Sequence, residues 1–184
     1  TWASGWKSPI YCDNRITLSH PGIRTYIRQK LTVLIQDQFG TVDCIAGVAT
    51  AGIPQGVLVA QELGLPFIYV RSAAKGHGRQ NLIEGSYETG QKAVVIEDLI
   101  STGKSSLEVA EVLRAHGATV IGMVGLFTYG FPEAAAAFEK ANVPLFTISN
   151  YSALMEVAED QKIISTEEKA HLETWRLSPS TWNK

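Results

Sequence analysis

The sequence has few cysteines, no long apolar run and no excess of positive charge, and each shortage excludes a class of protein. Two cysteines among 184 residues, Cys12 and Cys44, exclude a small domain held together by many disulfides. Their spacing suggests neither a disulfide nor a metal site, although a single disulfide stays open, so we expect a reducing, cytoplasmic location. The sequence shows neither a signal peptide nor an apolar stretch near the length of a membrane helix. The net charge of −2 disfavours general binding to nucleic acids or anionic membranes.

The residues that are present suffice for one full hydrophobic core. Hydrophobic residues make up 45% of the chain, which predicts a single domain over residues 1–184. Apolar runs alternate with helical periodicity, which predicts an α/β fold with a central parallel sheet flanked by helices. After a strand or loop within 1–22, the expected strands are 42–48, 66–71, 92–97, 119–127 and 144–149. The expected helices are 23–38, 55–63, 104–116, 132–141, 151–161 and 166–176.

The stretch 93–106 carries the clearest chemical signal. Four apolar residues, 93–96, predict a buried strand that presents Glu97 and Asp98 at its carboxyl end. A polar turn, 101–103, then opens a helix. Carboxylates accept hydrogen bonds from ribose hydroxyls or orient a hydrated Mg²⁺, and backbone N–H groups at a helix N-terminus bind phosphate. The pattern therefore predicts a site for a phosphorylated sugar.

Other interpretations of the same stretch explain less. A P-loop needs a glycine five residues before Gly103, where this chain has Asp98. A helix capped by Ser101 or Thr102 would explain the hydroxyls but not two consecutive acids after a buried strand. Lys104 either faces a phosphate or extends into water.

A second informative stretch is the polar segment 72–85. Arg71, Lys75, His77 and Arg79 recur at alternate or near-alternate positions among small residues. One interpretation is a solvated loop without a role, and the other is a basic loop that closes over a polyphosphate and balances the charge of a departing pyrophosphate. Because ligands of parallel sheets bind outside the carboxyl ends of strands, we expect the loops 49–54, 72–85 and 98–103 to meet.

Several segments together resemble one family. Glu97-Asp98-Leu-Ile-Ser-Thr-Gly-Lys-Ser105 is similar to the motif with which type I phosphoribosyltransferases bind phosphoribosyl pyrophosphate (PRPP). Arg71-Ser-Ala-Ala-Lys-Gly-His-Gly78 and the following residues 81–85 closely resemble the catalytic loop of orotate phosphoribosyltransferases. The segments 4–15 and 127–131 are similar to that family too. The resemblance implies the type I phosphoribosyltransferase fold, with a small hood formed by terminal segments and an additional helix before Thr1.

The resemblance also implies a reaction and its residues. Orotate phosphoribosyltransferases transfer ribose 5-phosphate from PRPP to N1 of orotate, with Mg²⁺, giving orotidine 5′-monophosphate and pyrophosphate in pyrimidine biosynthesis. The implied catalytic residues are Lys75, His77 and Asp98, and the Mg²⁺ is held mainly by PRPP near the acid pair. The implied PRPP-binding residues are Thr50, Ala51, Gly52, Arg71, Lys75, His77, Glu97, Asp98, Leu99, Ile100, Ser101, Thr102, Gly103, Lys104 and Ser105.

The base-binding end of the site is where this chain departs from its family. Relatives often bind orotate with an arginine after the strand ending near 127, and residues 127–133 contain none. Ser101 matches a position that touches orotate, and Lys7 or Arg15 are candidates for its carboxylate, although Arg15 can equally form a structural ion pair. Tyr11 either stacks on the pyrimidine or is buried in the core.

The resemblance implies a homodimer in which the segment 71–85 completes the neighbouring active site. Two alternatives stay open: a phosphoribosyltransferase for another base, and a PRPP-binding regulator without catalysis.

Overall fold

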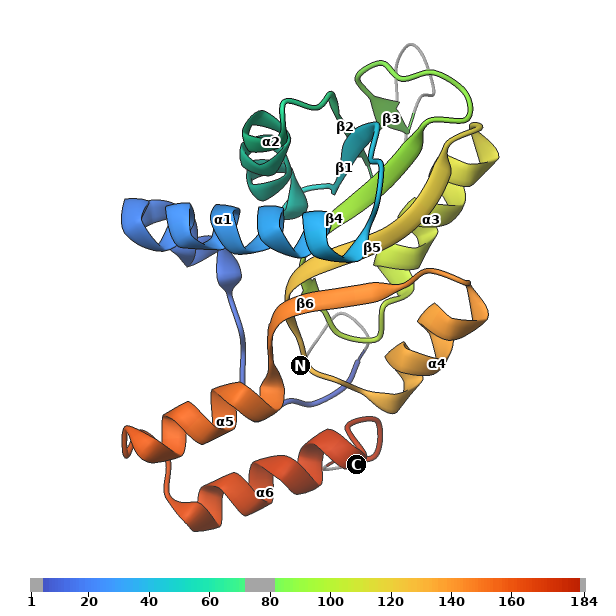
Figure 1. Cartoon of the computed structure of the whole chain (residues 1–184). Helices are drawn as coiled ribbons and strands as arrows, with labels where there is room; N and C mark the ends of the chain where they lie inside the picture. Colours follow the sequence, from blue (N-terminus) through green and yellow to red (C-terminus); the bar gives the residue numbers. More distant parts are fainter. Residues whose placement is uncertain (1–4, 72–81, 183–184) are drawn as a thin grey trace.

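A computed structural model describes residues 5–71 and 82–182, in which one six-stranded sheet is surrounded by helices (Figure 1). The strands follow the order β3-β2-β1-β4-β5-β6 across the sheet. They are β1 (Cys44–Val48), β2 (Phe67–Val70), β3 (Ile83–Glu84), β4 (Lys92–Ile100), β5 (Thr119–Thr128) and β6 (Leu145–Asn150). The helices are the short 3₁₀ helix η1 (Asn14–Ser19), α1 (Pro21–Gln38), α2 (Gly52–Leu63), α3 (Lys104–Ala115), α4 (Pro132–Lys140), α5 (Tyr151–Asp160) and α6 (Thr166–Leu177).

The sheet is parallel except at one edge. β3 pairs antiparallel with β2, through Tyr69 with Glu84 and Val70 with Ile83, whereas all other pairs are parallel. The expectation of a parallel sheet is confirmed for five strands, and the expectation of a continuous polar loop over 72–85 is wrong at residues 83–84. A strand of two residues is too short to show the alternation from which strands are predicted.

Helices cover both faces of the sheet, which explains why β1 is buried at every residue. Successive strand residues point to opposite faces and join two separate apolar clusters. On one face, α1 and α2 cover the cluster that contains Ile45, Val94 and Ile96. On the other face, α3 and α4 cover the cluster that contains Ala46 and Val95.

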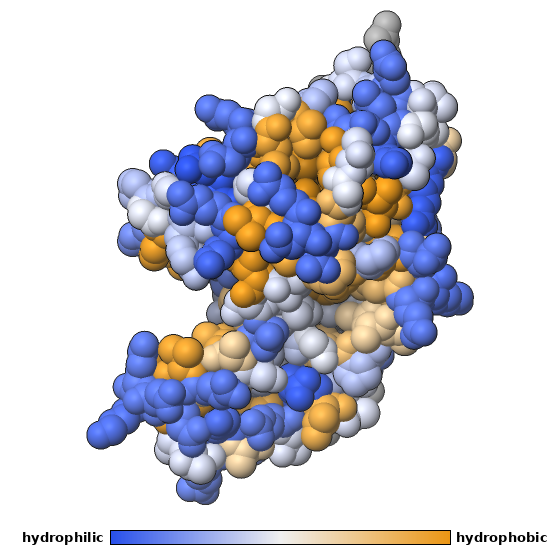
Figure 2. Space-filling view, in the orientation of Figure 1, coloured by the Kyte–Doolittle hydropathy of each residue, from blue (hydrophilic) through white to orange (hydrophobic). Residues whose placement is uncertain are grey.

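The terminal segments form a hood beside the carboxyl end of β5. Helices α5 and α6 lie away from the sheet (orange and red in Figure 1), and a notch separates them from α1 on the face shown in Figure 2. Trp175 of α6 lies 5.8 Å from Tyr129 and 5.7 Å from Phe131, measured between ring centroids. Its indole N–H also donates to the carbonyl of Lys7 at 3.1 Å. The hood therefore shares one aromatic core with the end of β5.

Candidate active site

A cavity of about 800 Å³ opens at the carboxyl ends of β1 and β4. Of the three loops expected to meet, 49–54 and 98–103 do so, and with the adjoining strand ends they supply lining residues within 48–51, 97–99 and 101–105. Most of the third loop, residues 72–81, lies outside the described residues. A further wall is the segment before and within η1. The lining residues are Tyr11, Cys12, Asp13, Arg15, Val48, Ala49, Thr50, Ala51, Glu97, Asp98, Leu99, Ser101, Thr102, Lys104, Ser105, Glu108 and Tyr129.

The two adjacent acids occupy different environments, although both line the cavity. β4 continues to Ile100, so the acids lie within the strand and the expectation that it ends before Asp98 is wrong. Glu97 is only 5% exposed, and its carboxylate accepts from the Ser106 hydroxyl at 2.8 Å and from the Asp98 N–H at 2.9 Å. Burial, followed by the neighbouring Asp98, raises the pKa of Glu97 well above its usual value. Asp98 is only partly buried. Asp98 is therefore the acid better placed to meet a ligand.

The turn 101–103 leads into α3 without a side-chain cap. Gly103 is the N-cap of α3, and no side chain forms a capping hydrogen bond. The alternative of a helix capped by Ser101 or Thr102 is therefore wrong. Gly103 has a φ of 78°, and an added Cβ would lie 2.6 Å from Phe138. Four polar residues of this turn line the cavity: three that carry hydroxyls, Ser101, Thr102 and Ser105, and Lys104 with its ammonium group. A helix N-terminus with free side-chain hydroxyls suits a phosphate monoester.

The loop between β1 and α2 brings backbone close to the acid pair. Residues 49–51 line the cavity, the peptide between Ala49 and Thr50 is cis, and α2 begins at Gly52, three residues earlier than expected. A Cβ on Gly52 would overlap the carbonyl oxygen of Ile96. The absence of a side chain there allows the first turn of α2 to touch β4, which keeps the 49–51 backbone beside the acid pair.

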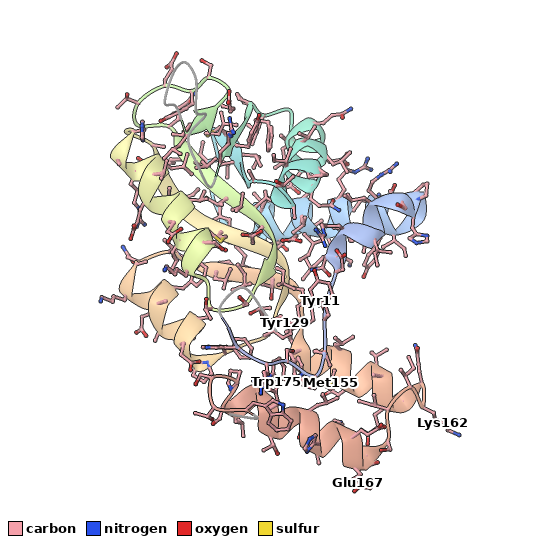
Figure 3. The ribbon with its side chains drawn as sticks, turned by 180° about the vertical axis from the view of Figure 1, so that it is seen from behind. Tyr11, Tyr129, Met155, Lys162, Glu167 and Trp175 are labelled. Atoms are coloured by element: carbon pink, nitrogen blue, oxygen red, sulfur yellow. The ribbon has the colours of Figure 1, made fainter. Side chains whose placement is uncertain are left out.

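The segment before η1 supplies lining residues that sequence reasoning missed. Cys12 and Asp13 had no assigned role, yet both face the cavity. Arg15 donates from Nε and Nη2 to the Asp13 carboxylate at 2.7 and 2.8 Å. The structure therefore contains the ion pair that the sequence left open as an alternative for Arg15. This bond raises the pKa of Arg15 and lowers the pKa of Asp13. Figure 3 shows Tyr11 on the N-terminal segment between the sheet and the hood. Its side chain is 74% exposed, so the alternative that it is buried in the core is wrong.

Several predicted residues lie elsewhere. Ile100 is fully buried in the core, while Gly52 and Gly103 are buried beside the cavity rather than among its lining residues. Arg71 forms an ion pair with Glu84 at 3.5 Å, and its N–H donates to the Leu82 carbonyl at 2.8 Å. Lys7 is exposed but does not line the cavity. Lys75 and His77 lie outside the described residues.

Tyr129 also lines the cavity and was missed by sequence reasoning. Burial raises its pKa to about 12, so its hydroxyl stays protonated at neutral pH. Its position two residues after the 119–127 strand was visible in the sequence. A single tyrosine after a strand, however, carries no pattern that distinguishes a cavity wall from the core.

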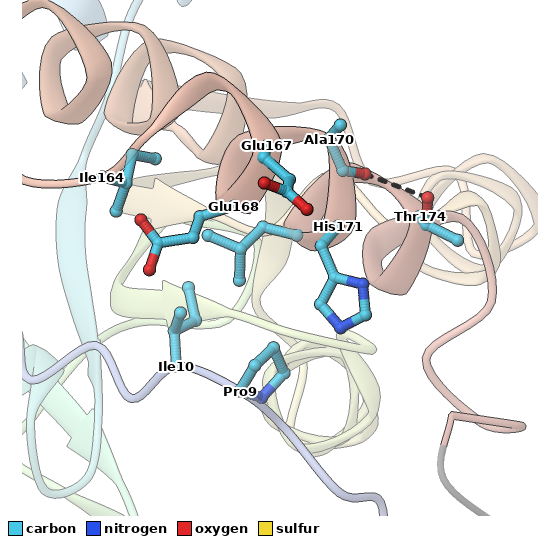
Figure 4. A pocket seen from close by; sticks show the side chains of 9 residues that line it. Pro9, Ile10, Ile164, Glu167, Glu168, Ala170, His171 and Thr174 are labelled. Carbon is cyan, nitrogen blue, oxygen red and sulfur yellow. Dashed lines mark hydrogen bonds between the residues drawn. The ribbon is translucent and has the colours of Figure 1, made fainter.

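A second cavity of about 660 Å³ lies between the N-terminal segment and α6 (Figure 4). Pro9, Ile10 and Ile164 give it an apolar wall, while Glu167 and His171 stand at its edge. It contains none of the strand-end loops from which the sequence predicts a sugar-phosphate site. The cavity at β1 and β4 is therefore the candidate active site.

A family model described as "Phosphoribosyl transferase domain" matches residues 17–130. Over 183 residues, the chain is 56% identical to the orotate phosphoribosyltransferase of Bacteroides thetaiotaomicron, which covers 100% of this chain and 86% of that protein. The chain belongs to the orotate phosphoribosyltransferase family.

Solved structures of related proteins have the same fold as this chain. The crystal structure of orotate phosphoribosyltransferase from Aeropyrum pernix superposes with a TM-score of 0.78 at 28% identity, covering 90% of each chain. Leishmania donovani UMP synthase superposes with a TM-score of 0.82 at 28% identity, over 96% of this chain and 38% of that chain. The type I phosphoribosyltransferase fold expected from the sequence is thereby confirmed.

Within 5–71 and 82–182, no helix has the length and apolar character needed to cross a membrane. Over the same part of the chain, no cluster of three or more histidine, cysteine or acidic side chains is arranged to hold a metal ion.

Proposed function

We propose that the cavity at β1 and β4 transfers ribose 5-phosphate from PRPP to N1 of orotate. The observation that carries this proposal is the meeting of three groups in one cavity: the Asp98 carboxylate, the hydroxyl-rich turn 101–105 and the backbone of 49–51. A sugar phosphate needs an acceptor for its hydroxyls and donors for its phosphate, and these groups supply both. The activity is that of the family to which the chain belongs.

Each wall has a proposed role in binding PRPP. Asp98 and Glu97 hold the ribose hydroxyls, and the Asp98 carboxylate stabilises positive charge that develops on the ribose carbon. The turn 101–105 binds the 5-phosphate, and residues 50–52 hold the pyrophosphate with backbone N–H groups. Arg71, Lys75 and His77 balance the charge of the departing pyrophosphate. N1 of orotate attacks directly, so no protein nucleophile is needed.

The residues present fit a hydrated Mg²⁺ held mostly by the substrate. The cavity offers carboxylate oxygen from Asp98, which is the hard ligand that Mg²⁺ prefers. Mg²⁺ typically keeps several waters and uses one or two carboxylates together with substrate phosphates. When bound, it would neutralise negative charge on the pyrophosphate. We therefore propose that Mg²⁺ lies near the acid pair, Glu97 and Asp98, with PRPP supplying most of its ligands.

The segment before η1 is our candidate for the orotate end of the cavity. Ser101 and Arg15 line the cavity and are the described candidates to contact the base and its carboxylate. Tyr11 lies beside Arg15, whose Nη2 donates to the tyrosine hydroxyl at 3.3 Å, and its exposed ring is available for stacking. Lys7 lies on the same segment and remains a second candidate for the carboxylate.

The wider assembly is proposed from the family resemblance. We propose one phosphoribosyltransferase domain over 1–184 that forms a homodimer, in which the segment 71–85 completes the neighbouring site. The cysteines, Cys12 and Cys44, are both free, which fits the reducing cytoplasm that we propose as the location.

Changing Asp98 tests this assignment of the cavity. Asp98→Asn is expected to lower kcat/KM with PRPP by about 100-fold or more, because an uncharged amide no longer stabilises developing positive charge. Orotate consumption, followed by its ultraviolet absorbance, measures the loss. Glu111→Gln on α3 removes an equal charge outside the cavity and serves as the matched control. Equal activity of Asp98→Asn and this control would contradict the proposed site.

A further inference from the structure

One hydrogen bond joins the segment before α1 to the strand that carries the acid pair. The side-chain amide of Asn14 donates from Nδ2 to the backbone carbonyl of Asp98 at 2.7 Å. Asn14 is only partly exposed, and its neighbours in the sequence, Asp13 and Arg15, line the cavity. The bond therefore connects the proposed orotate wall directly to the backbone of the proposed ribose-binding acid.

Two side chains form hydrogen bonds with the backbone of Asp98. Its N–H donates to the Glu97 carboxylate at 2.9 Å, and its carbonyl accepts from Asn14. The Asp98 backbone is thus bonded to the Glu97 side chain through its N–H and to the Asn14 side chain through its carbonyl. Because the Cα–Cβ bond turns with the adjoining peptide planes, these two bonds contribute to the direction of the carboxylate.

Asn14 is itself well fixed for this role. The Thr17 hydroxyl donates to the Asn14 carbonyl at 2.6 Å, which holds its backbone in the first turn of η1. The Cys12 thiol lies 3.4 Å from Asn14 Oδ1 and donates to it, which leaves the amide N–H groups facing Asp98. Burial raises the pKa of the Cys12 thiol, so this donor stays protonated at neutral pH. The side-chain amide therefore has one preferred orientation.

We infer that Asn14 is a positioning residue that aims the Asp98 carboxylate at the ribose and couples it to the segment forming the orotate wall. The inference rests on the proposed function, since it acts through the ribose-binding role of Asp98. A carboxylate that must stabilise charge in a transition state has to be held within a fraction of an ångström. Loss of the Asn14 bond is thus expected to affect turnover more than ground-state binding.

Two substitutions of Asn14 isolate the bond. Asn14→Asp keeps the size and the acceptor for Cys12 but replaces the N–H donor with an oxygen that faces the Asp98 carbonyl. Asn14→Ala removes the whole group. Both are expected to lower kcat by about 10- to 100-fold, with the KM values for PRPP and orotate changed by less than about 3-fold.

Arg24→Met supplies the matched control. Arg24 donates from Nη1 to the Leu18 carbonyl at 2.8 Å, which is the same kind of bond to the same segment, away from the cavity. This variant is expected to keep the wild-type kcat. If Arg24→Met lowers kcat as much as Asn14→Ala does, the segment needs anchoring in general and the inference is overturned.

A double-mutant cycle separates positioning from general support of the structure. Asn14→Ala is measured in the wild-type and the Asp98→Asn backgrounds, by turnover and by calorimetric titration with PRPP and Mg²⁺. If Asn14 acts through Asp98, its substitution costs little in the Asp98→Asn background. Equal losses in both backgrounds, with an active wild type, overturn the inference alone. A wild-type protein that neither binds PRPP nor consumes orotate overturns the proposed function and the inference with it.

Discussion

At the scale of single residues, two neighbouring acids differ in burial and therefore in what they can contact. Glu97 is bonded to Ser106 and to the Asp98 N–H, whereas Asp98 keeps part of its surface at the cavity. The sequence locates the pair, because two acids follow a buried apolar run. It does not distinguish them, since burial depends on how α3 brings Ser106 against β4. Cys12, Asp13 and Asn14 were equally invisible as site residues, because their segment meets the acid pair through contacts between distant residues, such as the bond from Asn14 to Asp98, 84 positions along the chain.

The burial of Glu97 predicts a pH-dependent stability. Its native pKa is raised to about 8 from 4.5, so the unfolded chain ionises first as pH rises and the native state loses stability between these values. Glu97→Gln does not titrate. The free energy of unfolding of Glu97→Gln relative to wild type should therefore rise by about 1–3 kcal/mol from pH 5 to pH 8. Urea unfolding at several pH values measures the difference, and a difference that is flat with pH would refute the raised pKa.

At the scale of elements, the strands and helices that position the site were largely predictable from periodicity. Strands β1, β4 and β5 read as apolar runs because both faces of the sheet are covered. The elements that sequence reasoning missed, η1 and β3, are too short to show a period. The early start of α2 was missed for a different reason. A glycine at position 52 suggests a turn, but here it permits close packing of the helix on β4.

This close packing predicts the effect of a single methyl group. Gly52→Ala forces the first turn of α2 away from the Ile96 carbonyl, which should cost about 1–3 kcal/mol of stability and weaken PRPP binding. Gly22→Ala is the control, because that glycine lies in α1 with no atom within 4 Å of an added Cβ. It should be neutral or slightly stabilising. Thermal unfolding and calorimetry with PRPP compare the two, and equal behaviour would contradict the packing argument.

At the scale of the whole molecule, the site lies where the sheet meets the hood. The aromatic core of Tyr129, Phe131 and Trp175 joins α6 to the end of β5, and the N-terminal segment crosses between them to form one cavity wall. Sequence reasoning anticipated a hood only through the family resemblance. No local pattern shows that residue 7 contacts residue 175, because such contacts depend on the complete fold.

The proposed exchange of segments between subunits also belongs to this scale. If the segment 71–85 serves the neighbouring site, mixed dimers of Lys75→Ala and Asp98→Asn chains contain one site with both native residues. Mixing the two inactive proteins should then restore up to about one quarter of wild-type activity per total chain, as statistical pairing gives half mixed dimers with one working site of two. Activity that stays at the level of the separate variants, once mixed dimers are verified by mass, would contradict a shared site.

A panel of bases decides whether this cavity joins PRPP to orotate. The purified chain is mixed with PRPP and Mg²⁺ and, in separate reactions, orotate, adenine or guanine, and the release of pyrophosphate is measured. Release of pyrophosphate is expected with orotate but not with adenine or guanine, in equal amount to orotidine 5′-monophosphate. Release with a purine but not with orotate would contradict the substrate, and tight PRPP binding without release for any base would indicate a regulator instead.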